Sequence, residues 1–312
     1  MKKLFFLLSF FCISAMVTFA QNVEKDTLWT HGGKIGINLS QSYFNNWTSG
    51  GQNNINGLGI LKYKVNYLKD KSKWENNFDF ALGYTYYDFD KKPVKTDDYI
   101  NLGSLYGYDI VKDKLFLTSE LSFKTQFANG YEYSKDSTNK ISGFLAPAYL
   151  ALGIGAQWVP CKHFSLTLSP VTGRLTIVND QELANQGAFG VTGAITDTLG
   201  NIIEKGKRTR LELGAQITAK FEYEIFENVT FSSKLGIFCD YIHSRKLNAL
   251  GEKYKCRPDF DWDNALIMKI NNWLSCNVTA HLIYDEDIKP IEGESFLQFK
   301  EVLSIGISYS IP

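Results

Sequence analysis

Ionisable side chains in this sequence stand at alternate positions of otherwise apolar segments, and these are the residues that could do chemistry. Alternate positions of an extended strand share one face, so the pattern gathers charges on one side of a sheet. If that side lines a hydrated interior, charges of both signs either pair across neighbouring strands or form rings that select among ions. The candidate lining residues are Lys62, Lys64, Glu75, Asp79, Glu120, Lys124, Glu212, Lys220, Glu222 and His281. The same parity also includes Asp109, Lys234, Asp240, Asp261, Asp263, Lys269, Asp285 and Lys300.

His281 is the histidine that lies within the interior of a predicted strand, and Asp285 follows on the same face. A lipid-modifying enzyme would need a nucleophile within hydrogen-bond reach of such a base, and spacing alone does not supply one. We therefore predict no catalytic residues and no enzymatic activity, with the lipid-modifying enzyme as the weakest alternative.

Asp259, Asp261 and Asp263 also alternate, which puts three carboxylates on one face. Carboxylates are calcium ligands, but no glycine turn accompanies them as it would in a calcium loop. A solvated acidic rim is the preferred interpretation. The sequence predicts no metal and no cofactor.

Composition narrows the class of protein. The first residues combine two lysines, an apolar run and the ending Thr18-Phe19-Ala20, which predicts a signal peptide over 1–20. Without Lys2 and Lys3, 31 basic residues face 33 acidic ones, so charge gives no case for nucleic acid. Tyr and Phe are abundant while Pro and Met are scarce, which suits strands and membrane interfaces. The four later cysteines, Cys161, Cys239, Cys256 and Cys276, are expected to be buried thiols acting as small apolar residues, with a disulfide as the alternative.

Alternation recurs in twelve segments, which predicts a single all-β domain: a transmembrane antiparallel β-barrel over residues 33–312, after a short periplasmic lead at 21–32. Connections alternate in length, as expected for short periplasmic turns and longer extracellular loops. The last strand should pair with the first, because an open sheet edge is not tolerated in lipid. Glu301 and Arg174 fall on the lipid-facing parity and fit only above the membrane. The predicted strands are 33–44, 54–68, 73–89, 98–111, 115–127, 143–158, 164–178, 207–225, 229–243, 260–270, 273–285 and 296–312.

The loop at 45–53 holds the most distinctive local motif, with Asn46 and Trp47 followed by Gly50 and Gly51. Together with the earlier Trp29-Thr30-His31-Gly32-Gly33, it resembles a Bacteroidetes family of unknown function, number 3078. The resemblance implies an outer-membrane location and brings no activity or site residue. The loop is either a ligand- or partner-binding segment at the barrel mouth or a glycine turn whose Trp47 packs locally, and the structural interpretation is preferred.

Three functional hypotheses follow. The first is a small-solute channel or transport accessory, and the second is a non-conducting structural or assembly partner in the envelope. The third is the lipid-modifying enzyme. In each case we expect the outer membrane of a Gram-negative, Bacteroidetes-like bacterium, contact with outer-membrane lipid, and the barrel-assembly machinery as a partner during insertion. A further envelope protein partner is possible, and nucleic acid is not expected.

Overall fold

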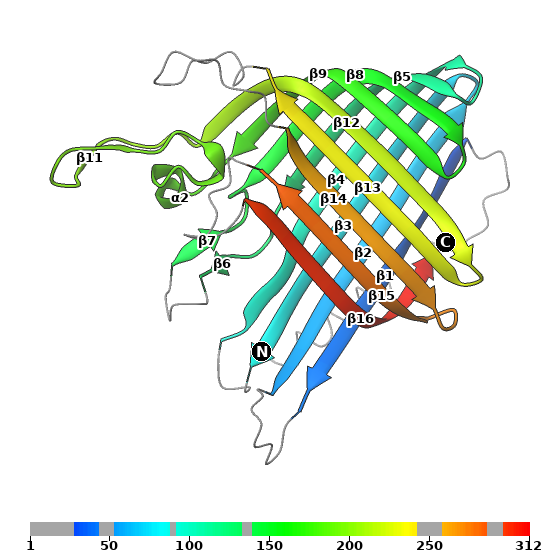
Figure 1. Ribbon diagram of the computed structural model, residues 1–312, viewed down its shortest axis with the longest axis horizontal. Coiled ribbons are helices and arrows are strands. Elements are labelled where there is room, and N and C mark those ends of the chain that lie inside the picture. The colour runs from blue at the N-terminus through cyan, green and yellow to red at the C-terminus, as the bar shows by residue number, and fades with distance from the viewer. Residues whose placement is uncertain (1–27, 44–52, 88–91, 133–138, 242–257, 286–295) are drawn as a thin grey trace, which may run out of the picture.

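A computed structural model describes residues 28–43, 53–87, 92–132, 139–241, 258–285 and 296–312. Twelve strands close into one antiparallel barrel in the order β1-β16-β15-β14-β13-β12-β9-β8-β5-β4-β3-β2 (Figure 1). This confirms the predicted fold class. The barrel strands are β1 (Trp29–Ser42), β2 (Asn54–Lys69), β3 (Ser72–Tyr87), β4 (Val94–Val111), β5 (Leu115–Thr125), β8 (Ala148–Cys161), β9 (Phe164–Ile177), β12 (Thr209–Phe226), β13 (Val229–Asp240), β14 (Asp259–Lys269), β15 (Leu274–Tyr284) and β16 (Leu297–Ile311).

The last strand pairs with the first, as predicted. β1 and β16 run antiparallel from the pair Gly33 and Ile311 to the pair Leu39 and Ile305. On its other side β1 pairs with β2 along its whole length, from Trp29 to Ser42. The barrel is therefore closed through a seam that is shorter than its neighbouring ladder.

The two ends of the barrel differ. At the end we call the turn end, strands are joined by tight turns in which Asp70, Asp113 and Asn228 adopt positive φ. Aspartate and asparagine tolerate this conformation better than most residues, which explains their choice. The opposite end, the loop end, carries α2, β6, β7 and β11, which lie together beyond the strand ends in Figure 1.

Loops at the loop end contain structure that the sequence did not predict. Between β5 and β8, β6 (Gly130–Tyr131) pairs with β7 (Lys140–Ser142). Between β9 and β12 lie the helix α2 (Gln181–Asn185), the 3₁₀ turn η1 (Ala188–Gly190) and the hairpin of β10 (Ile195–Thr196) and β11 (Ile202–Glu204). A small apolar core holds this region together and includes Ala146, Val178, Leu183, Ala184 and Val191.

The outer surface of the barrel is apolar. Outward residues on successive strands are exposed to a degree that a water-soluble protein would not sustain, for example Leu152, Ile305 and Ile307 at 52–57%. Exposed aromatics gather near both ends and form two girdles, as side chains suited to membrane interfaces do. Near the turn end they include Trp74, Tyr106, Tyr108, Trp158, Phe226, Trp273 and Tyr309, and near the loop end Tyr86, Phe127, Tyr241, Trp262 and Phe299. In the described part of the chain, no helix is long and apolar enough to cross a membrane.

Several predicted features are wrong in detail. β1 begins at Trp29 and β4 at Val94, each four residues before the predicted starts at 33 and 98. The sixth predicted strand begins at 143, whereas β8 begins at Ala148, because Leu145 takes positive φ and Pro147 cannot donate to a ladder. Cys239 is disulfide-bonded rather than free, while Cys161 and Cys276 are free thiols. Cys161 is exposed rather than buried, and Cys276 is half-buried. Cys256 lies outside the described residues.

Candidate functional site

The barrel interior, or lumen, is lined by the charged parity that the sequence indicated. Directly paired residues of adjacent strands face the same side of the sheet. Residues that are paired from strand to strand around the barrel therefore all face the lumen. Lys124 pairs with Asn101, Asn101 with Asp79 and Asp79 with Lys62. Glu222 belongs to the same face of β12 as Glu212 and Lys220.

Near the loop end, side chains from nearly opposite walls meet across the lumen. The ammonium of Lys124 on β5 donates to Oδ2 of Asp261 on β14 at 3.2 Å. The other oxygen of Asp261 lies 2.6 Å from Nε2 of His281 on β15, and that nitrogen is 3.5 Å from Asp263. Five strand-to-strand steps separate β5 from β14 along the shorter arc of the barrel, so this contact spans the interior.

A second bridge crosses the same end. Lys300 on β16 is ion-paired with Asp97 on β4 and also donates to the Thr96 carbonyl at 3.0 Å. His281 is the direct ladder partner of both Asp263 and Lys300. We call Asp97, Lys124, Asp261, Asp263, His281 and Lys300 the loop-end cluster.

An ion-pair network on the wall supports this cluster from one side. Arg174 donates through Nε and Nη2 to the two oxygens of Glu212 at 2.9 and 2.7 Å, and through Nη2 to Asp259 at 2.8 Å. The guanidinium also lies over the Phe238 ring, 4.1 Å from its centroid. Arg210 reaches Glu212 at 3.2 Å. Asp259 is thereby fixed two residues from Asp261, on the same strand.

Arg174 is therefore a correction to the sequence-based parity, which placed it toward lipid. The ladder between β9 and β12 shifts register where Ser169 pairs with Gln216 and Thr172 with Gly214. Pro170 and Val171 there stand opposite the single Ala215, so β9 carries one extra residue. Such a bulge reverses the facing of every later residue, so Arg174 enters the lumen.

Charges in the other half of the lumen face one another without such bridges. Lys220 on β12 lies within electrostatic range of Lys234, Glu120, Glu75 and Lys64, which come from four further strands. Lys220 and Lys234 are direct ladder partners despite their like charge. We call these five residues the turn-end cluster. Among the described residues, no ion pair crosses the lumen between them; Glu75 pairs with Lys73 on its own strand at 3.3 Å.

Lys73 shows how the turn-end wall is covered. Its side chain passes over Gly107 on β4, where an added Cβ would come within 2.9 Å of the lysine. It then lies 4.0 Å from the Phe116 ring centroid and donates to Gln157 on β8 at 2.6 Å. The lysine thus lies along the wall instead of projecting across the lumen.

The predicted mouth-loop residues Asn46, Trp47, Gly50 and Gly51 lie outside the described residues. The earlier motif is described and has a structural role. Trp29 packs against Tyr67 and Trp74, with ring centroids 4.8 and 5.9 Å apart. At Gly33 an added Cβ would stand 2.6 Å from both the Lys62 carbonyl oxygen and the Tyr63 ring. The glycine is required because the Tyr63 ring covers that position.

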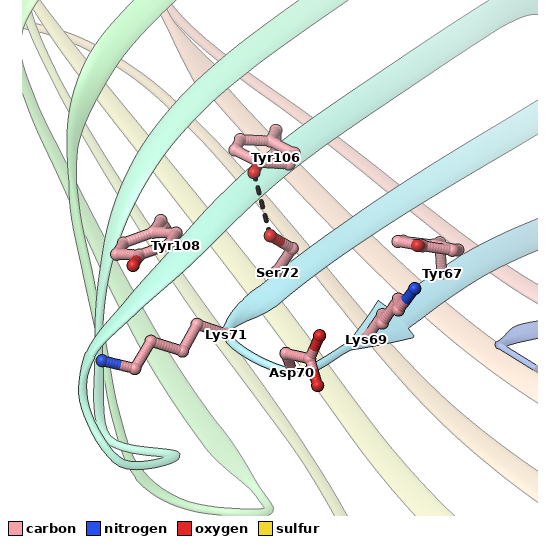
Figure 2. A pocket seen from close by; sticks show the side chains of 7 residues that line it. All are labelled: Tyr67, Lys69, Asp70, Lys71, Ser72, Tyr106 and Tyr108. Atoms are coloured by element: carbon pink, nitrogen blue, oxygen red, sulfur yellow. Dashed lines mark hydrogen bonds between the residues drawn. The ribbon is translucent and has the colours of Figure 1, made fainter.

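An open pocket of about 610 Å³ lies at the turn end, beside the β2–β3 turn (Figure 2). Its lining is Tyr67, Lys69, Asp70, Lys71, Ser72, Tyr106 and Tyr108. The hydroxyls of Tyr106 and Ser72 are 3.1 Å apart. Tyr106 and Tyr108 belong to the outward aromatic girdle, so this pocket lies outside the lumen.

Sequence reasoning missed several lumen residues, among them Asp97, Arg210 and Arg174. Asp97 was assigned to a loop because the fourth strand was started at 98, and Arg210 stood beyond the clear apolar alternation of its strand. Arg174 was misplaced by the bulge. Pro170 within a strand was the available signal for that bulge, since proline in a sheet is largely confined to edges and bulges.

A closed antiparallel barrel with an apolar outside and a charged lumen belongs to the class of outer-membrane β-barrels. The sequence profile of a family described as a protein of unknown function, DUF3078, matches residues 39–131. This confirms the resemblance that the sequence indicated, and the matched range includes the motif at Asn46 and Trp47.

Solved structures similar to the chain are membrane barrels of several activities. They include the translocator domain of the autotransporter NalP from Neisseria meningitidis (10% identity, 98% of this chain and 95% of that chain, TM-score 0.39). For an outer-membrane channel from Pseudomonas putida F1 the identity is 12%, the match covers 93% of this chain and 99% of that chain, and the TM-score is 0.40. For outer membrane phospholipase A from Escherichia coli the identity is 10%, the match covers 92% of this chain and 94% of that chain, and the TM-score is 0.39. Likeness at this level carries no inference about activity. No curated protein matches the sequence.

Proposed function

We propose that this protein is a narrow, water-filled passage for small hydrophilic solutes across the outer membrane. The observation that carries the proposal is the loop-end cluster, in which hydrated side chains from opposite walls narrow the lumen. Lys124, Asp261 and Asp263 remain 44%, 42% and 57% exposed, so water reaches them. The cluster of buried apolar residues in the described chain lies in the loops at the loop end, and includes none of the charged lumen residues.

The orientation follows from the two ends. We place the turn end in the periplasm and the loop end outside the cell, the usual asymmetry of these barrels. The loop-end cluster then stands near the outer mouth, where a solute meets it first. Both signs of charge are present, so the passage excludes mainly by size and discriminates weakly by charge.

Planar-bilayer recording of the folded, purified protein tests the proposal. We expect discrete single-channel openings from the wild type. Lys124→Glu exchanges a positive for a negative charge; at about 8 Å in water this two-unit change is worth about 1 kcal/mol to a passing monovalent ion, so cation permeability rises about fivefold and anion permeability falls about fivefold, which raises the cation-to-anion permeability ratio. The matched change Lys64→Glu, in the turn-end cluster, should alter the ratio less.

Silent bilayers with protein that shows heat-modifiable gel mobility would overturn the channel. An equal response to Lys124→Glu and Lys64→Glu would show that the loop-end cluster is not the narrowest level.

The second candidate is a non-conducting structural or assembly partner in the envelope. The observation that favours it is the β10–β11 hairpin, which extends away from the barrel in Figure 1. Its Leu199 and Ile203 are 86% and 70% exposed. If this role is correct, replacing both by Ser abolishes co-purification of an envelope protein while the barrel still folds. Unchanged co-purification, or recovery only as a free monomer, would contradict it.

A further inference from the structure

We propose that Asp261, Asp263 and His281 form a lumenal binding site for a divalent transition-metal cation, for which Zn²⁺ is the probe. The three side chains come from two adjacent strands, and their ligand atoms all lie within 4.8 Å of one another. Nε2 of His281 is already 2.6 Å from one Asp261 oxygen and 3.5 Å from Asp263. The proposal does not require that the barrel conducts.

The strands fix this geometry. Asp263 and His281 are direct ladder partners, and Asp261 is the next residue of β14 on the same face. All three side chains therefore point into the lumen from a rigid wall rather than from a loop. The exposed fractions of His281 and Asp263, 28% and 57%, leave the remaining coordination positions open to water.

The donor set selects the class of metal. One imidazole nitrogen with two carboxylates suits Zn²⁺ and its first-row neighbours, whereas Ca²⁺ takes six to eight oxygen ligands. The sequence alone offered three alternating aspartates. In the structure Asp259 is ion-paired with Arg174 at 2.8 Å and is not part of the proposed site. His281 is the third ligand instead. The set that converges is thus a mixed nitrogen and oxygen site.

Lys124 gives the site a built-in competitor. Its ammonium is 3.2 Å from Oδ2 of Asp261, so the carboxylate has a cation on one oxygen and the imidazole at the other. A divalent cation on Asp261 repels that ammonium. Metal binding and the cross-lumen bridge are therefore alternatives, and removing the lysine charge should favour the metal.

The test is calorimetric titration of the full-length folded barrel in detergent with Zn²⁺. We expect one saturable equivalent that is lost in His281→Gln. Asp263→Asn should weaken binding by at least about tenfold. Lys124→Gln should instead tighten it, and Asp79→Asn, a lumenal carboxylate outside the site, should leave it unchanged. Heat-modifiable mobility checks that each variant is folded.

Substituting Co²⁺ gives a second readout, because its d–d absorption reports the ligand set. A spectrum that changes in His281→Gln but not in Asp79→Asn supports the site. Wild-type protein that binds no Zn²⁺, or a stoichiometry unaffected by both His281→Gln and Asp263→Asn, would overturn it. Neither result depends on conductance, so this failure is distinguishable from failure of the proposed channel.

Discussion

The two halves of the lumen are built from the same kinds of residue and behave differently. In the loop-end cluster, Lys124 meets Asp261 and Lys300 meets Asp97, each from a distant strand. In the turn-end cluster, Lys220 stands directly beside Lys234, and the glutamates are on other strands. Opposite charges facing across a lumen draw side chains inward, whereas like charges on one wall hold them apart. Alternation decides which face a residue occupies, and barrel closure decides what it meets.

Burial separates structural ion pairs from those that shape the passage. Lys124 and Asp261 are each more than two-fifths exposed, and such pairs contribute only about 0–1 kcal/mol to stability. Glu212 is 3% exposed and is bound by Arg174 and Arg210. The wall network should therefore hold the barrel together, while the cross-lumen bridges can be changed without unfolding it.

The largest expected effect follows from that difference. Arg174→Ala leaves the buried Glu212 with Arg210 as its remaining partner and removes the contact with Asp259, so we expect a loss of about 3 kcal/mol of unfolding free energy. Urea titration in lipid vesicles, followed by heat-modifiable mobility, measures it. Lys124→Ala is the lumenal control and should cost under about 1 kcal/mol. Equal losses in the two variants would remove the distinction between wall and bridge.

In the turn-end half, the free energy of unfolding should depend more on close backbone packing than on charge. Gly33→Ala places a methyl group 2.6 Å from the Lys62 carbonyl and the Tyr63 ring, so we expect a loss of about 1–3 kcal/mol. Gly103→Ala is the matched control, because nothing lies within 4 Å of its Cβ position. The same urea titration compares them. A Gly33→Ala barrel as stable as the Gly103→Ala barrel would show that β1 and β2 can separate without cost.

The smallest effect concerns the loops above the loop-end cluster. Asp180 caps α2 through the amides of Glu182 and Leu183 and accepts from Lys140 at 2.8 Å. Lys140 and these amides hold the pKa of Asp180 below its usual range. The contribution, about 1 kcal/mol of local stability, is thus present above the ordinary aspartate pKa of about 3.9 and is lost as pH falls through the lowered value.

Hydrogen exchange of the α2 amides across acid pH measures this change. Asp180→Asn keeps a capping oxygen but has no carboxylate to titrate. In this variant, the protection of the α2 amides from exchange should therefore show no stepwise loss as pH falls. A step of the same size in Asp180→Asn would assign it to another group.

Much of this architecture was predictable because the lipid imposes it. All twelve strands, their alternating connections and the closing pair follow from period-two alternation and from the intolerance of hydrocarbon for open edges. The ten candidate lining residues were predicted from the same alternation. Asp97, Arg174 and the cross-lumen partners were not, because they depend on a bulge and on which strands end opposite each other after closure. The fold of the 179–206 segment depends on its small apolar core, which leaves no periodic pattern.

The short seam between β1 and β16 also leaves two strand edges parted toward the loop end. The two strands stop pairing with each other beyond Leu39 and Ile305, although both continue toward the loop end. Backbone edges that have parted leave amides and carbonyls that need hydrogen-bond partners other than each other. A side-chain hydrogen bond joins the two strands at this level, because the Asn38 side chain donates to Ser304 Oγ at 3.2 Å. Glu301, whose outward parity conflicted with lipid, lies in the parted stretch of β16, so polar backbone and a carboxylate coincide at one place on the outer wall.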